Sequence, residues 1–173
     1  MKRQPIGVDD YKEIVDKDLY FVDKTLLVKE IIDDSSKVVL IARPRRFGKT
    51  LNMSVLRHFF EKTKGDTSYR FKEYKIWQQG DEYIKEQGKY PVITLTFKNV
   101  KMSNWNINLA LIKDVISSEF IRHSYILKSN AIEGKNKEIF ENIYNGKAET
   151  KDYINSLELL SKALYNYHNI LLS

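Results

Sequence analysis

The stretch KVVLIARPRRFGKTLNMSVLRHFF, residues 37–60, decides the fold that the sequence predicts. Its apolar run at 38–42 is uninterrupted and rich in β-branched residues, which is typical of a strand buried on both faces. From residue 51 to residue 60 the apolar side chains recur at helical spacing. The predicted inner face of this helix consists of Leu51, Val55 and Phe59, with Leu56 and Phe60 beside them. A short basic loop ending in Gly48, Lys49 and Thr50 therefore joins a predicted strand to a predicted helix.

The rest of the chain continues this alternation of strands and helices. Residues 90–97 (YPVITLTF) predict a second strand, and Pro91 suits its start. Three amphipathic helices are expected after it, with apolar stripes at Trp105, Leu109, Ile112, Ile116 and Phe120, at Ile139, Phe140 and Ile143, and at Tyr153, Leu157, Leu160, Leu164 and Tyr167. Residues 169–173 (NILLS) begin like a third strand. We therefore expect an α/β fold, in which helices flank a parallel sheet.

The composition is that of a soluble globular protein. At 173 residues, 42% of them hydrophobic, the chain is long enough for one domain with a substantial core. No apolar run approaches the roughly 20 residues of a membrane span, and no apolar segment follows the basic N-terminus as in a secretory signal. The chain has no cysteine, which excludes disulfides and thiolate chemistry and fits a reducing compartment. We expect a cytoplasmic protein that does not bind membranes.

The net charge of +6 is concentrated around the basic loop. Between residues 42 and 62 there is one acid, Glu61. The basic residues of the same stretch are Arg43, Arg45, Arg46, Lys49, Arg57 and Lys62. Elsewhere acidic and basic residues nearly balance. A single cluster of this kind favours a compact anionic ligand over a long nucleic-acid track.

Gly48, Lys49 and Thr50 are the residue types that a phosphate-binding loop requires. Backbone amides at a helix N-terminus hold phosphate oxygens, a lysine reaches the outer phosphates, and a hydroxyl binds magnesium. Two features depart from the pattern G-x-x-x-x-G-K-[ST]: Arg43 stands where the first glycine is expected, and Pro44 removes an amide donor. The alternative is a basic surface turn that contains Gly-Lys-Thr by chance. The strand expected before the loop and the helix expected after it favour the nucleotide site.

RPRRFGKTLNMSVLRHFFE, residues 43–61, resembles the Walker A segment of the bacterial AAA-ATPase-like family, whose loop reads R-P-R-R-F-G-K-[ST]-L. Three further stretches resemble the same family in the same order: residues 6–33 around the sequence VDKT, residues 89–101, and residues 155–168. The two departures in the loop are therefore features of that family. The resemblance implies a P-loop NTPase-like sheet, and in many members a downstream domain resembling PD-(D/E)xK nucleases.

The resemblance also implies ATP and Mg²⁺ as ligands and assigns roles to residues of this chain. Phosphate and magnesium binding would fall to Arg45, Arg46, Gly48, Lys49 and Thr50, with Thr50 on the metal. The segment 20–25 would lie against the adenine. Phe21 and Val22 are then candidate base contacts, although packing in the core suits two such apolar residues equally well.

The Walker B strand of that family, with its Asp-Glu end, has no counterpart in this sequence, because no acid follows His168. We expect residues 1–173 to be the N-terminal part of such a domain, ending at or before the Walker B strand in an incomplete sheet and truncated relative to the family. Hydrolysis needs these acids, so the chain should bind ATP and hydrolyse little. Glu61 could substitute only from the far end of the predicted helix. Two alternatives remain open: a non-catalytic module that docks on a second copy, a full-length relative or another partner, and a basic nucleic-acid-binding module.

Several other residues have ordinary structural interpretations. His58, His123 and His168 have neither metal-ligand spacing nor an evident carboxylate partner, which favours surface or packing roles. Adjacent Asp9 and Asp10 should be solvated. Residues 64–77 predict an exposed helix, and Trp105 should belong to the core.

Overall fold

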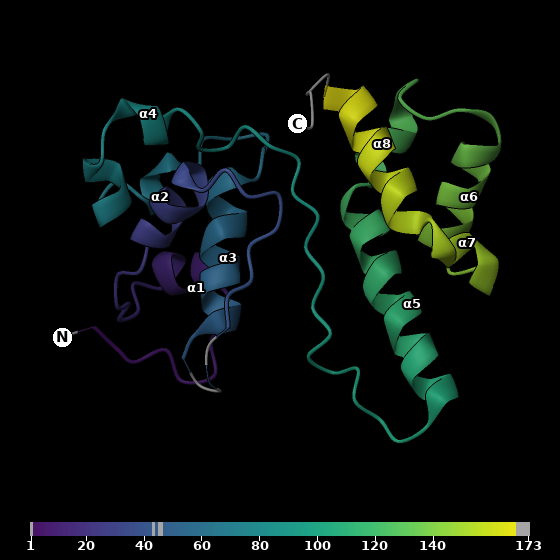
Figure 1. Cartoon of the computed structure of the whole chain (residues 1–173), viewed down its shortest axis with the longest axis horizontal. Helices are drawn as coiled ribbons and strands as arrows, with labels where there is room; N and C mark the ends of the chain where they lie inside the picture. Colours follow the sequence, from purple (N-terminus) through teal and green to yellow (C-terminus); the bar gives the residue numbers. More distant parts are fainter. Residues whose placement is uncertain (1, 43, 45–46, 169–173) are drawn as a thin grey trace. The chain divides into compact units, whose positions relative to one another are not determined.

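The computed structural model describes residues 2–42, 44 and 47–168 (Figure 1). The chain divides into two compact units, Met1–Val92 and Ile93–Ser173. Each unit has its own cluster of buried apolar side chains. Each is therefore described by itself.

The first unit is built from short helices around α3. Its elements in chain order are α1 (Tyr11–Asp16), α2 (Leu26–Asp33), α3 (Lys49–Phe60), the 3-10 turns η1 (Ser68–Arg70) and η2 (Lys75–Gln78), and α4 (Asp81–Ile84). α3 confirms the helix predicted from residue 51 to residue 60. Both α1 and α2 pack against it (Figure 1).

Aromatic rings form much of the core of the first unit. Tyr11, Phe59 and Phe71 are fully buried. The ring of Phe71 lies 5.1 Å from those of Tyr11 and Phe59, centroid to centroid. The Tyr11 hydroxyl also donates a 2.6 Å hydrogen bond to the carbonyl oxygen of Arg70, so its polar end is satisfied inside the core. These contacts attach α1 to α3 and to the segment after it.

The second unit is a helical assembly around α5. Its elements are α5 (Trp105–Arg122), η3 (Ser124–Lys128), α6 (Gly134–Tyr144), α7 (Thr150–Ile154) and α8 (Ser156–His168). Its core includes Phe120 and Phe140, whose ring centroids lie 4.6 Å apart, together with Leu160 and Leu164. The three amphipathic helices predicted after residue 104 are confirmed, the last of them interrupted at Asn155.

The prediction of a parallel sheet is wrong for the described part of the chain. Residues 38–42 form no strand, and Val38 and Leu40 are more than four-fifths exposed. The region 90–97 contributes a single isolated parallel bridge, between Tyr90 and Glu61. An apolar sequence supplies side chains for a strand, but a strand also needs a neighbouring backbone to pair with. The amide of Thr94 donates instead to the carboxylate of Glu119, at 2.8 Å. Residues 169–173, the predicted third strand, lie outside the described residues.

Two smaller predictions are also wrong. Trp105, at the first turn of α5, is 68% exposed. The apolar stripe of α5 continues to this turn, but the core does not extend that far. Residues 64–77 contain two 3-10 turns with buried Phe71 and Ile76 and no exposed α-helix. Among the helices that the structure describes, none is both long enough and apolar enough to cross a membrane.

Candidate functional site

The loop singled out by the sequence leads directly into α3. Gly48 caps this helix with φ of +71°, a left-handed conformation that glycine adopts without strain. The amide of Asn52 donates to the carbonyl oxygen of Gly48 at 2.8 Å and closes the first turn. Lys49 and Thr50 are the first two helical residues, and both are exposed. The structure thus places the three candidate phosphate-binding residues together at the N-terminus of a helix, where the positive end of the helix dipole lies.

Arg45 and Arg46, the other two candidate phosphate ligands, lie outside the described residues. Their roles stay predictions. Pro44 and Phe47, which are described, are exposed.

Asp10 fastens α3 to α1. Its Oδ1 accepts a hydrogen bond from the amide of Glu13 at 3.1 Å and so caps α1. Its Oδ2 accepts from Ser54 Oγ at 3.3 Å and lies 3.1 Å from His58 Nε2. Ser54 Oγ in turn accepts from the amide of Tyr11 at 2.8 Å. We call Asp10, Ser54 and His58 the Asp10 cluster.

The Asp10 cluster corrects two sequence predictions. Asp10 is a cap and a bridge between helices and is not merely solvated, and His58 does have a carboxylate partner. Burial lowers the pKa of His58, although the nearby Asp10 opposes the shift. Burial would raise the pKa of Asp10, but hydrogen bonds from His58 and from the Glu13 amide outweigh it and lower the pKa. His123 likewise pairs with Glu119, at 3.4 Å.

The two candidate base contacts in segment 20–25, Phe21 and Val22, lie in different surroundings. Phe21 is half-buried and packs edge-on against Tyr11 and Tyr74, with ring centroids 5.2 and 5.4 Å away, against the core of the first unit. Val22 is 57% exposed. Core packing therefore accounts for Phe21, whereas a contact between either residue and a base stays a prediction.

Asp23 and Thr25 fix the backbone on both sides of Lys24. The Asp23 carboxylate accepts from the Thr25 amide at 2.9 Å, from the Thr25 hydroxyl at 2.7 Å and from the Lys75 amide at 2.8 Å. The Thr25 hydroxyl oxygen accepts from the Ile76 amide at 3.2 Å, and Thr25 is fully buried. This network joins the VDKT sequence to η2.

Lys24 is the residue near the loop that sequence reasoning did not assign. A Cβ placed on Gly48 would lie 3.8 Å from Lys24 Nζ, so this ammonium group lies beside the N-terminal cap of α3. In the sequence, the clue to Lys24 is its position in VDKT, between an aspartate and a threonine whose side chains fix the backbone on either side of it. The resemblance placed segment 20–25 against the adenine, but the contact between Lys24 and the loop is seen only in the structure.

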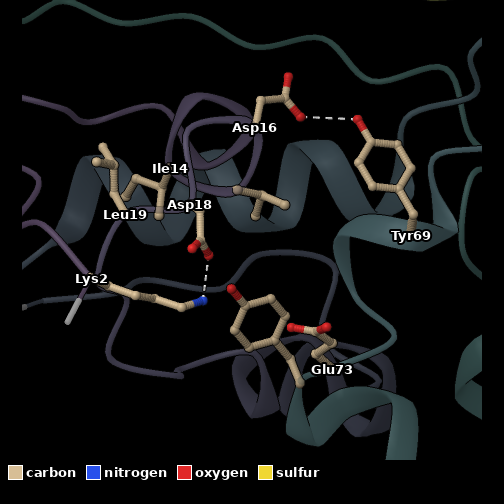
Figure 2. Close-up of a pocket in the computed structure, with 9 residues that line it drawn as sticks. Lys2, Ile14, Asp16, Asp18, Leu19, Tyr69 and Glu73 are labelled. Atoms are coloured by element: carbon tan, nitrogen blue, oxygen red, sulfur yellow. Dashed lines mark hydrogen bonds and ion pairs between the residues drawn. The ribbon is translucent and has the colours of Figure 1, made fainter.

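A cavity of about 480 Å³ lies elsewhere in the first unit (Figure 2). It is lined by Lys2, Ile14, Val15, Asp16, Asp18, Leu19, Tyr69, Glu73 and Tyr74. Figure 2 shows Lys2 directed at Asp18, 2.6 Å away, and Tyr69 directed at Asp16, 3.0 Å away. The hydrogen bond to Asp18 raises the pKa of Lys2. Of the loop residues that the structure describes, none lines this cavity, and its carboxylates suit it poorly for phosphate.

A protein-only metal site is not evident where the structure is described. Among those residues no group of three or more histidine and carboxylate side chains could hold a metal ion.

Comparison with known proteins identifies a family and a relative. A family model described as Predicted AAA-ATPase matches residues 5–166. An uncharacterized protein in the vnfD 5' region of Azotobacter chroococcum mcd 1 is 38% identical over 60 residues, which is 34% of this chain and 11% of that relative. The chain therefore aligns with about a ninth of the relative's length. No solved structure matches. The family match does not test the expectation of a downstream nuclease-like domain, which stays a prediction.

Proposed function

The chain belongs to the Predicted AAA-ATPase family, and we propose that it binds ATP with Mg²⁺ through the loop of Gly48, Lys49 and Thr50. Family membership supports the use of a nucleotide and magnesium in general. The observation that carries the finer proposal is the left-handed Gly48 directly before the exposed Lys49 and Thr50 of α3. A nucleotide's phosphates match this arrangement in charge and in hydrogen-bonding capacity.

Each residue of the loop has a distinct part in the proposed binding. Gly48 carries no Cβ, so a phosphate can approach the backbone amides at the start of α3. Lys49 supplies a mobile positive charge for the outer phosphates. Thr50 is exposed and offers a hydroxyl oxygen, the type of ligand that Mg²⁺ prefers. When bound, the magnesium ion would neutralise phosphate charge. Arg45 and Arg46 would add positive charge to the same loop.

We further propose that these 173 residues hydrolyse ATP slowly or not at all. Glu61, the acid within the basic stretch, follows the last residue of α3, roughly 16 Å along the helix axis from Thr50. Its carboxylate also pairs with Arg57 at 3.1 Å. Asp10 contacts α3 nearer to the loop, but its Oδ1 accepts from the Glu13 amide and its Oδ2 is engaged with Ser54 and His58. Neither acid is placed to orient a water molecule at the phosphates.

Calorimetric titration with MgATP tests the binding proposal. Lys49→Ala removes a charge-assisted contact worth about 1.5–3 kcal/mol and should weaken binding by roughly one to two orders of magnitude. Thr50→Ala should weaken binding mainly when magnesium is present. Lys89→Ala, at an exposed lysine of the same unit, is the matched control and should bind as the wild type does. Equal affinities for wild type and Lys49→Ala would refute the site.

Phosphate release tests the second part of the proposal. The wild-type chain should release phosphate from ATP at the background rate, with or without DNA. Robust release that Lys49→Ala abolishes would contradict the expectation of slow hydrolysis while supporting the site. Salt-dependent DNA binding that MgATP does not displace would instead support the nucleic-acid function for the basic loop.

A further inference from the structure

We propose that Lys24 is a second phosphate-binding lysine of the nucleotide site, one that acts from outside the Gly-Lys-Thr loop. The inference rests on the proposed function of that loop. It assigns to the VDKT sequence a direct contact with the ligand's phosphates. Neither the loop pattern nor the family match assigns that role to Lys24.

The first support for this role is the position of the Lys24 ammonium group beside the loop. Lys24 Nζ lies beside Gly48, 3.8 Å from where a Cβ on that residue would stand. Gly48 is the residue at which a phosphate can come closest to the backbone of the loop. A lysine ammonium next to that point can donate to a phosphate oxygen that the α3 amides also bind.

The second support is that the backbone of Lys24 is anchored. The residues on either side, Asp23 and Thr25, form hydrogen bonds with each other and with the amides of Lys75 and Ile76. Thr25 is fully buried, which fixes the point from which the Lys24 side chain extends. An anchored lysine loses less conformational freedom on binding than one on a mobile loop, so more of its interaction energy becomes affinity.

The third support is charge. Among the residues that the structure describes, no hydrogen bond or ion pair involves the Lys24 ammonium group. The adjacent Asp23 carboxylate is engaged with Thr25 and with the Lys75 amide. Lys24, Lys49 and the positive end of the α3 dipole therefore share one region, where a ligand carrying several negative charges would be stabilised. A nucleotide polyphosphate is such a ligand.

The test compares Lys24→Gln, Lys24→Arg and the control Lys89→Gln in titrations of the full chain with MgATP, MgADP and AMP. Lys24→Gln should raise the Kd for MgATP by about ten- to a hundred-fold, the effect of one lost charge-assisted contact. Lys24→Arg should recover part of that loss, and Lys89→Gln should match the wild type. The loss caused by Lys24→Gln should be smaller for AMP than for MgATP, because AMP has fewer phosphates.

A chemical measurement on the wild-type chain guards against a variant that fails to fold. Acetylation of lysines, followed by mass spectrometry, should be slowed by MgATP at Lys24 and Lys49 and unchanged at Lys89. If Lys24→Gln binds MgATP as the wild type does and Lys24 is not protected, the inference is overturned. The proposed function survives that result provided that Lys49→Ala still weakens binding. If the wild-type chain binds no nucleotide, both fail.

Discussion

Replacing Asp10 by alanine should lower the free energy of unfolding of the first unit by about 2–4 kcal/mol, because Asp10 fastens α3 to α1. The residue lies far from the loop in sequence. It nonetheless holds the helix that begins at the loop, through Ser54 and His58 on the buried side of α3. The prediction therefore concerns the scaffold on which the proposed site depends.

The magnitude comes from two contributions. Loss of the Asp10 side chain removes the N-cap of α1, which is typically worth about 1 kcal/mol. It also leaves His58, only 8% exposed, without the partner of its Nε2 atom, which costs roughly another 1–3 kcal/mol. The side chain of Asp10 is 41% exposed, so direct attraction between charges adds little. Ser54 keeps its hydrogen bond from the Tyr11 amide and adds no further penalty.

The assay can isolate the first unit because the two tryptophans lie in different units. Trp77 packs against the core of the first unit, whereas Trp105 is 68% exposed in the second. In a Trp105→Phe background, urea unfolding followed by tryptophan fluorescence reports on Trp77 alone. Glu30→Ala, which removes an exposed carboxylate from α2, is the matched control and should shift the midpoint little. If Asp10→Ala shifts the midpoint no more than Glu30→Ala does, the Asp10 cluster does not hold α3 and the reasoning fails.

Other predictions test the charge, the backbone and the second core. The pKa of His58 is lowered in the folded chain, so the unfolded chain takes up the proton first as the pH falls. The free energy of unfolding should therefore decrease as the pH drops below about 6.5. In urea unfolding at several pH values, His58→Gln should make the free energy of unfolding depend less on pH. Gly48→Ala, at φ of +71°, should cost about 1–2 kcal/mol of stability and weaken MgATP binding; a neutral effect on both would contradict the loop geometry. Phe120→Ala should destabilise the second unit by about 3–5 kcal/mol, and Trp105→Ala by less than about 0.5 kcal/mol. If the two variants lower the melting temperature by similar amounts, the assignment of Phe120 to the core and Trp105 to the surface is wrong.

Helices were predictable from this sequence because their signal is local. The spacing of Val55 and Phe59 is enough to define the buried face of α3, and that of Ile116 and Phe120 does the same for α5. The limit lies at the helix ends, where periodicity continues beyond the core. Trp105 continues the apolar stripe of α5 and is nonetheless exposed.

The lack of a sheet in the described part of the chain could not be predicted, because a strand depends on a partner elsewhere in the chain. The apolar run at 38–42 and the segment 90–97 have the composition of strands, but the described backbone around them forms only the Tyr90–Glu61 bridge. A local pattern cannot reveal that the Thr94 amide binds the Glu119 carboxylate, 25 residues away.

The candidate site was predictable in part for the same reason. Gly48, Lys49 and Thr50 are consecutive, so their joint position at the start of α3 follows from one local pattern. Lys24 and the Asp10 cluster reach α3 only through tertiary packing. Adjacent residues in the sequence therefore revealed the loop, whereas its surroundings required the structure.

The most direct test of the proposed nucleotide site is a titration of the isotope-labelled chain with MgATP, followed by NMR at each backbone amide. The proposed function predicts saturable shift changes that are largest at Gly48, Lys49 and Thr50, where the amides at the start of α3 would meet the phosphates. Saturable changes that leave these three amides unmoved and fall instead around Asp18 and Glu73 in the separate cavity, or no changes at millimolar MgATP, would contradict it.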